Sequence, residues 1–325
     1  MNYRRLGKTD LHISEIGFGA WGIGGGWGIQ DDAGALAALR RAFDLGVNFY
    51  DTAAVYGDGH SETLIGQAFH ADRDKVIIAS KIPPKTYKWP VGPGTPLAET
   101  FPRAWIIEMT ERSLKNLGTD YLDLQQLHAW TDDFTTRLEW REAFEELKKQ
   151  GKIRAYGVSV NDWDPYGGVN LVKAGLVDSV QVIYNIFEQR PDEQLLPAAL
   201  EQGVGILARV PFEEGVLTGA FKPGHVFEPG DWRKDWLTPE RLEIANKRLD
   251  KLRGLLDANA PDLATLALKF ILSNPAVTTT IPGMRKLRNV EANARASDGR
   301  LLEAAKLEQL RAQAFWHGWY YPWSA

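Results

Sequence analysis

Short apolar runs alternate with amphipathic segments along almost the whole chain. Runs of this length, bounded by turn residues, are typical of buried strands. They predict eight strands, over residues 15–19, 47–51, 76–81, 122–128, 153–160, 179–185, 204–210 and 278–281. The segments between them have helical spacing and predict helices over residues 33–45, 61–69, 104–117, 137–150, 168–173, 193–202, 239–259 and 263–273. A β-hairpin over residues 3–14 precedes the series.

This alternation predicts a single α/β domain over residues 1–325. Strands separated by helices imply right-handed crossovers and a parallel sheet. Eight such units in one series favour a closed (β/α)8 TIM barrel over an open, doubly wound sheet. A glycine follows the last periodic residue of five predicted helices, as left-handed helix caps do; these are Gly46, Gly118, Gly151, Gly175 and Gly203.

Three segments exceed the length that the barrel needs: residues 83–103, residues 213–237 and the segment from Ser297 onward. The first two follow the third and seventh predicted strands, so we expect both to be long loops over the C-terminal mouth of the barrel. The tail, residues 315–323, is rich in tryptophan and tyrosine. We expect it to be packed down or to line a pocket, because an exposed aromatic tail would promote aggregation.

Composition narrows the function classes. The net charge is -4 and the sequence pI is near 5.9. The chain therefore lacks the excess of basic residues that would predict nucleic acid or an anionic membrane as a partner. The chain has no cysteine, which excludes disulfides, thiolate catalysis and cysteine-bound zinc. His12, His60, His70, His225 and His317 lack the spacing that is typical of metal ligands, so we expect no metal. No apolar run approaches a membrane span and the first residues lack a signal core, so we expect a cytoplasmic protein.

Candidate chemistry lies at three successive predicted strand ends. Asp51, Lys81 and His128 each close, or directly follow, one of these strands, and Tyr56 comes shortly after the first. Strand C-termini converge on the catalytic face of such a barrel. Lys81 needs a partner if it is buried, because an unpaired ammonium is costly there, and Asp51 on the neighbouring strand is well placed.

These four side chains together suit proton transfer to a carbonyl oxygen. A free tyrosine has a pKa of about 10, too high for efficient exchange near neutral pH. We expect the ammonium of Lys81 to lower the pKa of Tyr56, with Asp51 holding the lysine charged. His128 would hydrogen-bond a substrate oxygen. Such a site is suited to hydride transfer, in which an oxyanion must be protonated as the C–H bond forms.

The chain resembles the aldo-keto reductase family from end to end, nearest its bacterial branch that also resembles potassium-channel β subunits. Its motifs are GFGAW (17–21), NFYDTAAVYG (48–57), SETLIG (61–66), SK (80–81), YLDLQQLH (121–128), GKIRAYGVS (151–159), QVIYN (181–185) and IPG (281–283). The resemblance implies that Tyr56, Lys81, Asp51 and His128 form the catalytic tetrad, with Tyr56 as general acid. It also implies a nicotinamide cofactor held across the barrel mouth without a Rossmann fold.

The resemblance further assigns cofactor contacts. Ser159 and Gln181 would hold the carboxamide. The segment 211–219, with Pro211, Leu217, Thr218 and Gly219, would wrap the pyrophosphate. The adenosine end would lie against Gly283, Arg285, Asn289 and Asn293. Residues 17–22 formally match the dinucleotide fingerprint, but a second glycine cluster follows instead of a helix. We therefore interpret this stretch as the first strand and its loop, with Ala20 admitting the cofactor and Trp21 walling the pocket.

Some positions depart from the family pattern. Arg209 stands where relatives have an aromatic that stacks on the nicotinamide; its planar guanidinium would stack, or else reach a cofactor phosphate or an acidic substrate. Ala220 replaces a frequent phosphate-binding lysine, for which Lys222 would substitute. Arg285, Lys286 and Arg288 supply positive charge that favours NADP(H), with NAD(H) as the alternative.

Three functions compete. The leading hypothesis is an NAD(P)(H)-dependent oxidoreductase that interconverts small-molecule carbonyl compounds, sugars and polyols included, and alcohols, with a pocket of Trp21, Tyr56, His128 and Trp130. The second is a cofactor-binding regulatory subunit with little turnover. The third is a barrel isomerase or lyase that forms a Schiff base on Lys81. Substrate identity and oligomeric state are not encoded in these patterns.

Overall fold

Eight parallel strands form one sheet in the computed structural model, which describes residues 1–25, 31–162 and 164–317. Neighbours in the sheet follow chain order from β3 to β10. The strands are β3 (Phe18–Gly19), β4 (Phe49–Asp51), β5 (Ile77–Ile82), β6 (Leu122–Leu127), β7 (Ile153–Ser159), β8 (Ser179–Ile183), β9 (Gly205–Arg209) and β10 (Val277–Thr280). Each predicted strand is present, with ends shifted by a few residues.

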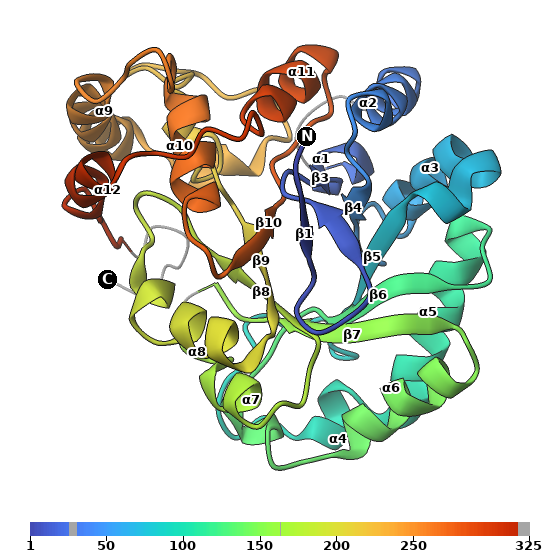
Figure 1. The fold of residues 1–325 in the computed structure, drawn as a ribbon. Helices are drawn as coiled ribbons and strands as arrows, with labels where there is room; N and C mark the ends of the chain where they lie inside the picture. The colour runs from blue at the N-terminus through green and yellow to red at the C-terminus, as the bar shows by residue number, and fades with distance from the viewer. Residues whose placement is uncertain (26–30, 163, 318–325) are drawn as a thin grey trace.

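The two outer strands of this sheet meet and close it into a barrel. The amide of Gly17 donates to the carbonyl of Thr280 at 2.8 Å, and the amide of Thr280 donates to Glu15 at 3.0 Å. Parallel bridges join Ile16 to Thr280 and Gly19 to Gly283. Closure pairs the two edge strands of the eight-stranded sheet with each other. The predicted (β/α)8 barrel is therefore confirmed (Figure 1).

Helices surround the barrel on its outer side (Figure 1). They are α1 (Trp21–Gly24), α2 (Asp32–Asp44), α3 (His60–Phe69), α4 (Leu97–Thr100), α5 (Arg103–Leu117), α6 (Glu139–Lys149), α7 (Val169–Lys173), α8 (Leu195–Gln202), α9 (Pro239–Arg253), α10 (Leu263–Leu272), α11 (Leu287–Arg295) and α12 (Ala304–Arg311). The five glycines predicted as caps all have positive φ, as at Gly118 (62°) and Gly203 (61°). The short helices α1 and α4, and α11 and α12, were not predicted.

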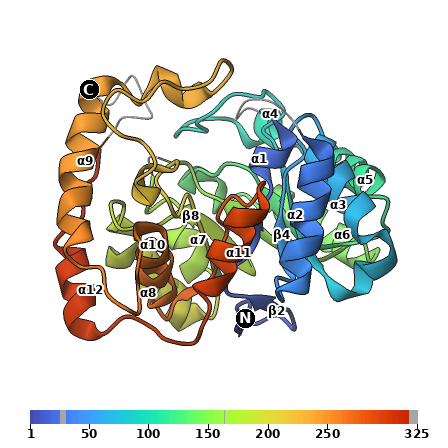
Figure 2. The same ribbon diagram turned by 90° about the horizontal axis from the view of Figure 1, so that it is seen from above.

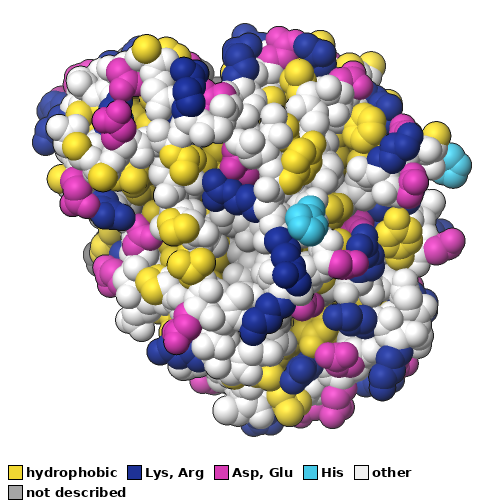
Figure 3. Space-filling model, in the orientation of Figure 1, with side chains coloured by type: hydrophobic (Ala, Val, Ile, Leu, Met, Phe, Trp, Pro, Cys, Tyr) yellow, Lys and Arg dark blue, Asp and Glu magenta, His cyan; other side chains and the backbone are white. Residues whose placement is uncertain are grey.

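The N-terminal hairpin seals one end of the barrel. Its strands β1 (Tyr3–Arg5) and β2 (His12–Ser14) pair antiparallel, as predicted. Leu6, Leu11 and Ile13 pack into the apolar cluster that fills the lower barrel, together with inward residues of the strands such as Leu124. Figure 2 shows the hairpin at the end opposite α1 and α4. Charged side chains of both signs are mixed over the hairpin face (Figure 3).

The segments after β5 and β9 lie over the other end, as predicted (Figure 2). Trp89 donates from Nε1 to the carbonyl of His128 at 3.3 Å, and the ring of Trp232 packs on that of Trp21 with centroids 5.7 Å apart. In the tail, the amide of Phe315 donates to the carbonyl of Phe187; residues 318–323 of the predicted aromatic tail lie outside the described part. Within the described residues, no helix has the length and apolar content to cross a membrane.

Candidate active site

The four predicted catalytic side chains converge at the open end of the barrel. Asp51 is the last residue of β4, Lys81 lies in β5, and His128 directly follows β6. Tyr56 lies in the turn between β4 and α3. Because β4, β5 and β6 are neighbours in the sheet, their C-terminal ends bring these groups together.

Lys81 is the centre of this arrangement. It is fully buried, and its Nζ donates to Asp51 Oδ1 at 2.5 Å, to the carbonyl of Thr52 at 2.7 Å and to Tyr56 Oη at 3.3 Å. An ammonium has three protons to donate, so this coordination satisfies it. Burial by itself would lower the pKa of Lys81, but Asp51 and Tyr56 outweigh it and the pKa is raised. The lysine is therefore held charged beside the phenol.

The pKa of Tyr56 moves in the direction opposite to the one expected from the sequence. Burial raises it above its usual value, and the charge of Lys81 offsets only part of that rise. Here the free-energy cost of removing a phenolate from water is larger than the gain from its attraction to the ammonium of Lys81. In this structure Tyr56 is consequently a protonated phenol at neutral pH, held in place by the lysine.

His128 is a neutral imidazole. Burial, together with the charges of Lys81 and Arg209, lowers its pKa well below the usual value. Its ring meets those of Tyr56 and Trp89 edge-on, with centroids 5.7 and 5.9 Å away. A neutral imidazole offers one donor and one acceptor nitrogen. It can therefore orient a substrate oxygen beside the Tyr56 hydroxyl without adding charge.

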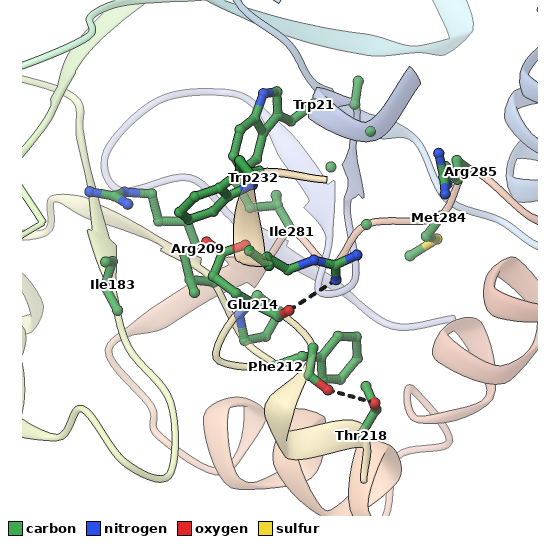
Figure 4. A pocket seen from close by; sticks show the side chains of 18 of the residues that line it. Trp21, Ile183, Arg209, Phe212, Glu214, Thr218, Trp232, Ile281, Met284 and Arg285 are labelled. Atoms are coloured by element: carbon green, nitrogen blue, oxygen red, sulfur yellow. Dashed lines mark hydrogen bonds between the residues drawn. The ribbon is translucent and has the colours of Figure 1, made fainter. Parts of the chain in front are cut away.

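A cleft of about 1050 Å³ opens over these residues and extends across the barrel mouth. Most predicted cofactor and substrate positions line it: Ala20, Trp21, Asp51, Tyr56, His128, Ser159, Gln181, Arg209, Pro211, Thr218, Gly283, Arg285, Asn289 and Asn293. Figure 4 shows Trp21 and Trp232 side by side in one part of the cleft and Arg285 in another. Ser159 and Gln181 are register partners on β7 and β8.

Four predicted positions lie elsewhere. Trp130 is fully buried, and its ring packs edge-on against Phe134 and Trp140, so it belongs to the packing between the barrel and α6 and not to the pocket. The other three do not line the cleft: Leu217 is buried in the core, Gly219 ends a short 3-10 turn, and the side chain of Lys222 is exposed.

Several cleft residues were not predicted. They are Trp89, Asp162, Ile183, Asp231, Trp232 and Arg233, whereas Phe212 and Glu214 lie within the predicted segment 211–219 but were not singled out there. Most come from the two long segments, for which the sequence predicts a position over the mouth but not which side chains face inward. Asp162 follows β7, and the only signal for it was its nearness to Ser159. Within the described residues, no group of three or more histidine, aspartate or glutamate side chains is arranged to hold a metal.

The fold and site define a (β/α)8-barrel protein with a buried lysine that bonds a half-buried tyrosine at the mouth of the barrel. The model of the Aldo/keto reductase family matches residues 15–313. The chain belongs to this family, as its motifs indicated.

Relatives match over nearly the full length. The uncharacterized oxidoreductase YqkF of Bacillus subtilis is 32% identical, covering 96% of both chains. The NADH-specific methylglyoxal reductase of Escherichia coli is 30% identical, covering 92% of this chain and 94% of its own. A probable voltage-gated potassium channel subunit beta of Arabidopsis thaliana is also 30% identical, covering 92% of each. Among solved structures, the aldo-keto reductase AKR11C1 of Bacillus halodurans (holo form) superposes with a TM-score of 0.77 at 30% identity, covering 97% of this chain and 96% of its own.

Proposed function

We propose that this protein reduces aldehydes or ketones, sugar carbonyls included, to alcohols and catalyses the reverse reaction, with NADP(H) as cofactor and Tyr56 as the general acid or base. The observation that carries the proposal is the buried lysine that bonds both Asp51 and Tyr56. A structural lysine needs only its counter-ion. One that also holds a phenol hydroxyl at the wall of a cleft is placed to stabilise that phenol when it loses its proton.

The cleft fits a nicotinamide dinucleotide. It is long enough to reach from Tyr56 to Asn293, whose buried side-chain amide nitrogen has no hydrogen-bond partner among the described residues. Such an orphaned donor is costly unless a ligand accepts from it. Ser159 and Gln181 would hold the carboxamide, and residues 211–219 would hold the pyrophosphate. Bound in its reduced form, the cofactor would supply a hydride to a carbonyl carbon.

The residues of the chain would manage the proton. Tyr56 is protonated at neutral pH, so its hydroxyl donates to the carbonyl oxygen as negative charge develops there. The phenolate that remains lies 3.3 Å from the ammonium of Lys81, which stabilises it. Asp51 keeps the lysine charged, and neutral His128 fixes the direction of the carbonyl oxygen. In the reverse direction, the phenolate accepts the alcohol proton.

The preference for NADP(H) rests on the basic residues Arg285, Lys286 and Arg288, which all line the cleft. Arginine recognises phosphate through paired, charge-assisted hydrogen bonds, so this group suits a 2′-phosphate. One relative is named an NADH-specific enzyme. The affinities of this protein for NADPH and NADH are therefore to be measured side by side. Quenching of tryptophan fluorescence by NADPH and by NADH compares the two affinities, because Trp21 lies in the cleft. Tighter binding of NADH would overturn the assignment.

Tyr56→Phe tests the function itself. We expect loss of carbonyl reduction with almost unchanged cofactor affinity, because the hydroxyl acts on the substrate. Wild-type turnover in this variant would refute the role of Tyr56. The channel-subunit relative raises a second candidate, a cofactor-binding subunit with little turnover. Tight cofactor binding without turnover across a broad panel of aldehydes and ketones would favour it.

A further inference from the structure

The C-terminal tail contacts the turn that follows β9. After α12 the tail packs on the loop that follows β8: the amide of Phe315 donates to the carbonyl of Phe187 at 2.8 Å, and the two rings meet edge-on with centroids 5.8 Å apart. Next in the tail, His317 places its Nε2 3.2 Å from Oε1 of Glu213. These two side chains have only 5% and 4% of their surface exposed. The tail is thereby joined to a turn that is distant from it in the sequence.

The backbone of this turn is strained. Val210, Glu213 and Glu214 have positive φ, at 54°, 49° and 52°. Residues with a side chain rarely adopt this conformation, and a β-branched residue such as valine does so least readily. Such residues persist only where the surrounding structure imposes their conformation. Three of them in so short a stretch therefore need firm anchors.

Glu213 differs from its neighbours in the direction of its side chain. Phe212 and Glu214 line the cleft (Figure 4), whereas Glu213 does not. The amides of Gly215 and Leu217 both donate to the carbonyl of Phe212 at 2.9 Å, so the residues that follow take their positions from this turn. Glu213 is consequently placed to hold the turn from its buried side without contacting a ligand in the cleft.

Two separate parts of the chain hold the carboxylate of Glu213. Asn185, in the loop after β8, donates from Nδ2 to Glu213 Oε2 at 2.7 Å and to the carbonyl of Val210 at 2.9 Å. His317 approaches the other carboxylate oxygen. A buried carboxylate needs such donors, because removing it from water without them is costly. The contact with the tail therefore completes the anchoring of the turn.

We propose that the C-terminal tail is part of the support of the cofactor site, and that His317, through Glu213, keeps the turn 210–214 in its strained conformation. This inference rests on the proposed function, in which residues 211–219 hold the pyrophosphate. His317 does not line the cleft, so it is a positioning residue that acts through Glu213.

Loss of this contact has a defined consequence for binding. Without it, the turn would also adopt unstrained conformations in which the segment 211–219 is not placed for a pyrophosphate. A ligand would then bind only the ordered fraction, and its apparent dissociation constant would rise by the inverse of that fraction. The loss should affect ligands that contain a pyrophosphate and spare those that contact only the adenosine end of the cleft.

The test compares two ligands by calorimetry on the full-length protein. NADPH contains the pyrophosphate, whereas 2′-AMP presents only adenosine and its 2′-phosphate. His317→Leu removes the donor and should weaken NADPH binding about tenfold while changing 2′-AMP binding less than about twofold. His317→Gln, whose amide can donate in place of the imidazole, should restore most of the NADPH affinity. The milder His317→Asn, which shortens the side chain and keeps its polarity, should show the same selective loss if His317→Leu does not fold.

Hydrogen exchange observes the turn directly. In His317→Leu, or in His317→Asn, the amides of residues 210–219 should lose protection while those of β4, β5 and β6 keep theirs. Trp316→Leu is the matched control, because this neighbouring tail side chain is exposed and lies over Arg190. It should leave both affinities and the exchange of the turn unchanged.

The outcomes separate this inference from the proposed function. Unchanged NADPH affinity and unchanged exchange of the turn in a folded His317 variant would overturn the inference and leave the proposed function standing. Equal weakening of NADPH and 2′-AMP, with protection lost throughout the barrel, would indicate a general loss of stability and overturn it as well. Absence of saturable NADPH binding by the wild-type protein would instead refute the proposed function.

Discussion

Gln181 donates a hydrogen bond from Nε2 to Asp51 Oδ2 at 2.9 Å, while the other oxygen of the same carboxylate accepts from Lys81. The bond links β8 to β4 across the barrel mouth. Gln181 is also the proposed carboxamide contact, so the group that would sense the cofactor is bonded to the carboxylate that holds the lysine. Occupation of the cleft and the proton chemistry thus share one hydrogen-bonded chain.

The buried ion pair gives the first prediction. Lys81→Met and Asp51→Leu should each reduce the free energy of unfolding by about 3–5 kcal/mol, because each leaves one buried charge without its partner. The double variant should be inactive yet more stable than either single variant, since no unpaired charge remains. Urea denaturation measures this. A double variant less stable than both singles would show that the pair contributes more than charge compensation.

The raised pKa of Tyr56 predicts opposite pH profiles for the two directions. Reduction needs the protonated phenol, so its kcat/KM should stay level through neutral pH and fall only in strongly alkaline solution. Oxidation of the alcohol needs the phenolate and should rise continuously with pH. The lowered pKa of His128 predicts no step near its usual value, between pH 6 and 7. A reduction rate that falls between pH 7 and 8 when the cofactor is saturating at every pH would contradict this assignment.

The sequence predicts those residues of the site whose positions are fixed by the path of the backbone. Asp51, Lys81 and His128 are predictable because each is fixed by the end of a strand, and parallel strands must end together. The closed barrel was also predictable, because eight strand–helix units in one series favour closure over an open sheet. The two long segments were placed correctly over the mouth by the strands that precede them.

What could not be predicted depends on packing in three dimensions. The direction of the pKa shift at Tyr56 is set by how completely the hydroxyl is enclosed, which spacing does not encode. Trp130 comes only two residues after His128 in the sequence, yet its indole packs against Trp140 and does not face the cleft. The ion pair of Arg209 with Asp162 joins the end of β9 to the loop after β7, and no pattern along the chain links the two residues.

Cofactor choice gives a third prediction. Arg285→Gln combined with Arg288→Gln should weaken NADPH binding by roughly tenfold or more while leaving NADH binding nearly unchanged, because only NADPH carries the 2′-phosphate. Fluorescence titration of both cofactors measures this. Equal weakening of the two would show that the arginines contact a part of the molecule that both cofactors share.

The last prediction concerns Glu214, which lies in the segment proposed to hold the pyrophosphate. Burial, with the neighbouring carboxylates Glu213 and Asp162, raises the pKa of Glu214 to about 8, and Arg233 and Arg209 offset only part of this rise. Below pH 8 the group is mostly neutral and is compatible with a bound anion. Above pH 8 it becomes a carboxylate in the same cleft and repels the phosphates.

Cofactor affinity should therefore fall as the pH rises from 7 to 9, by up to about tenfold. Glu214→Gln should remove this dependence and keep the affinity of the low-pH protein throughout. Glu243→Gln, on the outer helix α9 and away from the cleft, is the control and should retain the wild-type profile. Calorimetric titration with NADPH at four pH values measures all three proteins. If Glu214→Gln loses affinity above pH 8 as the wild type does, another group must titrate in the cleft and the carboxyl of Glu214 is not responsible.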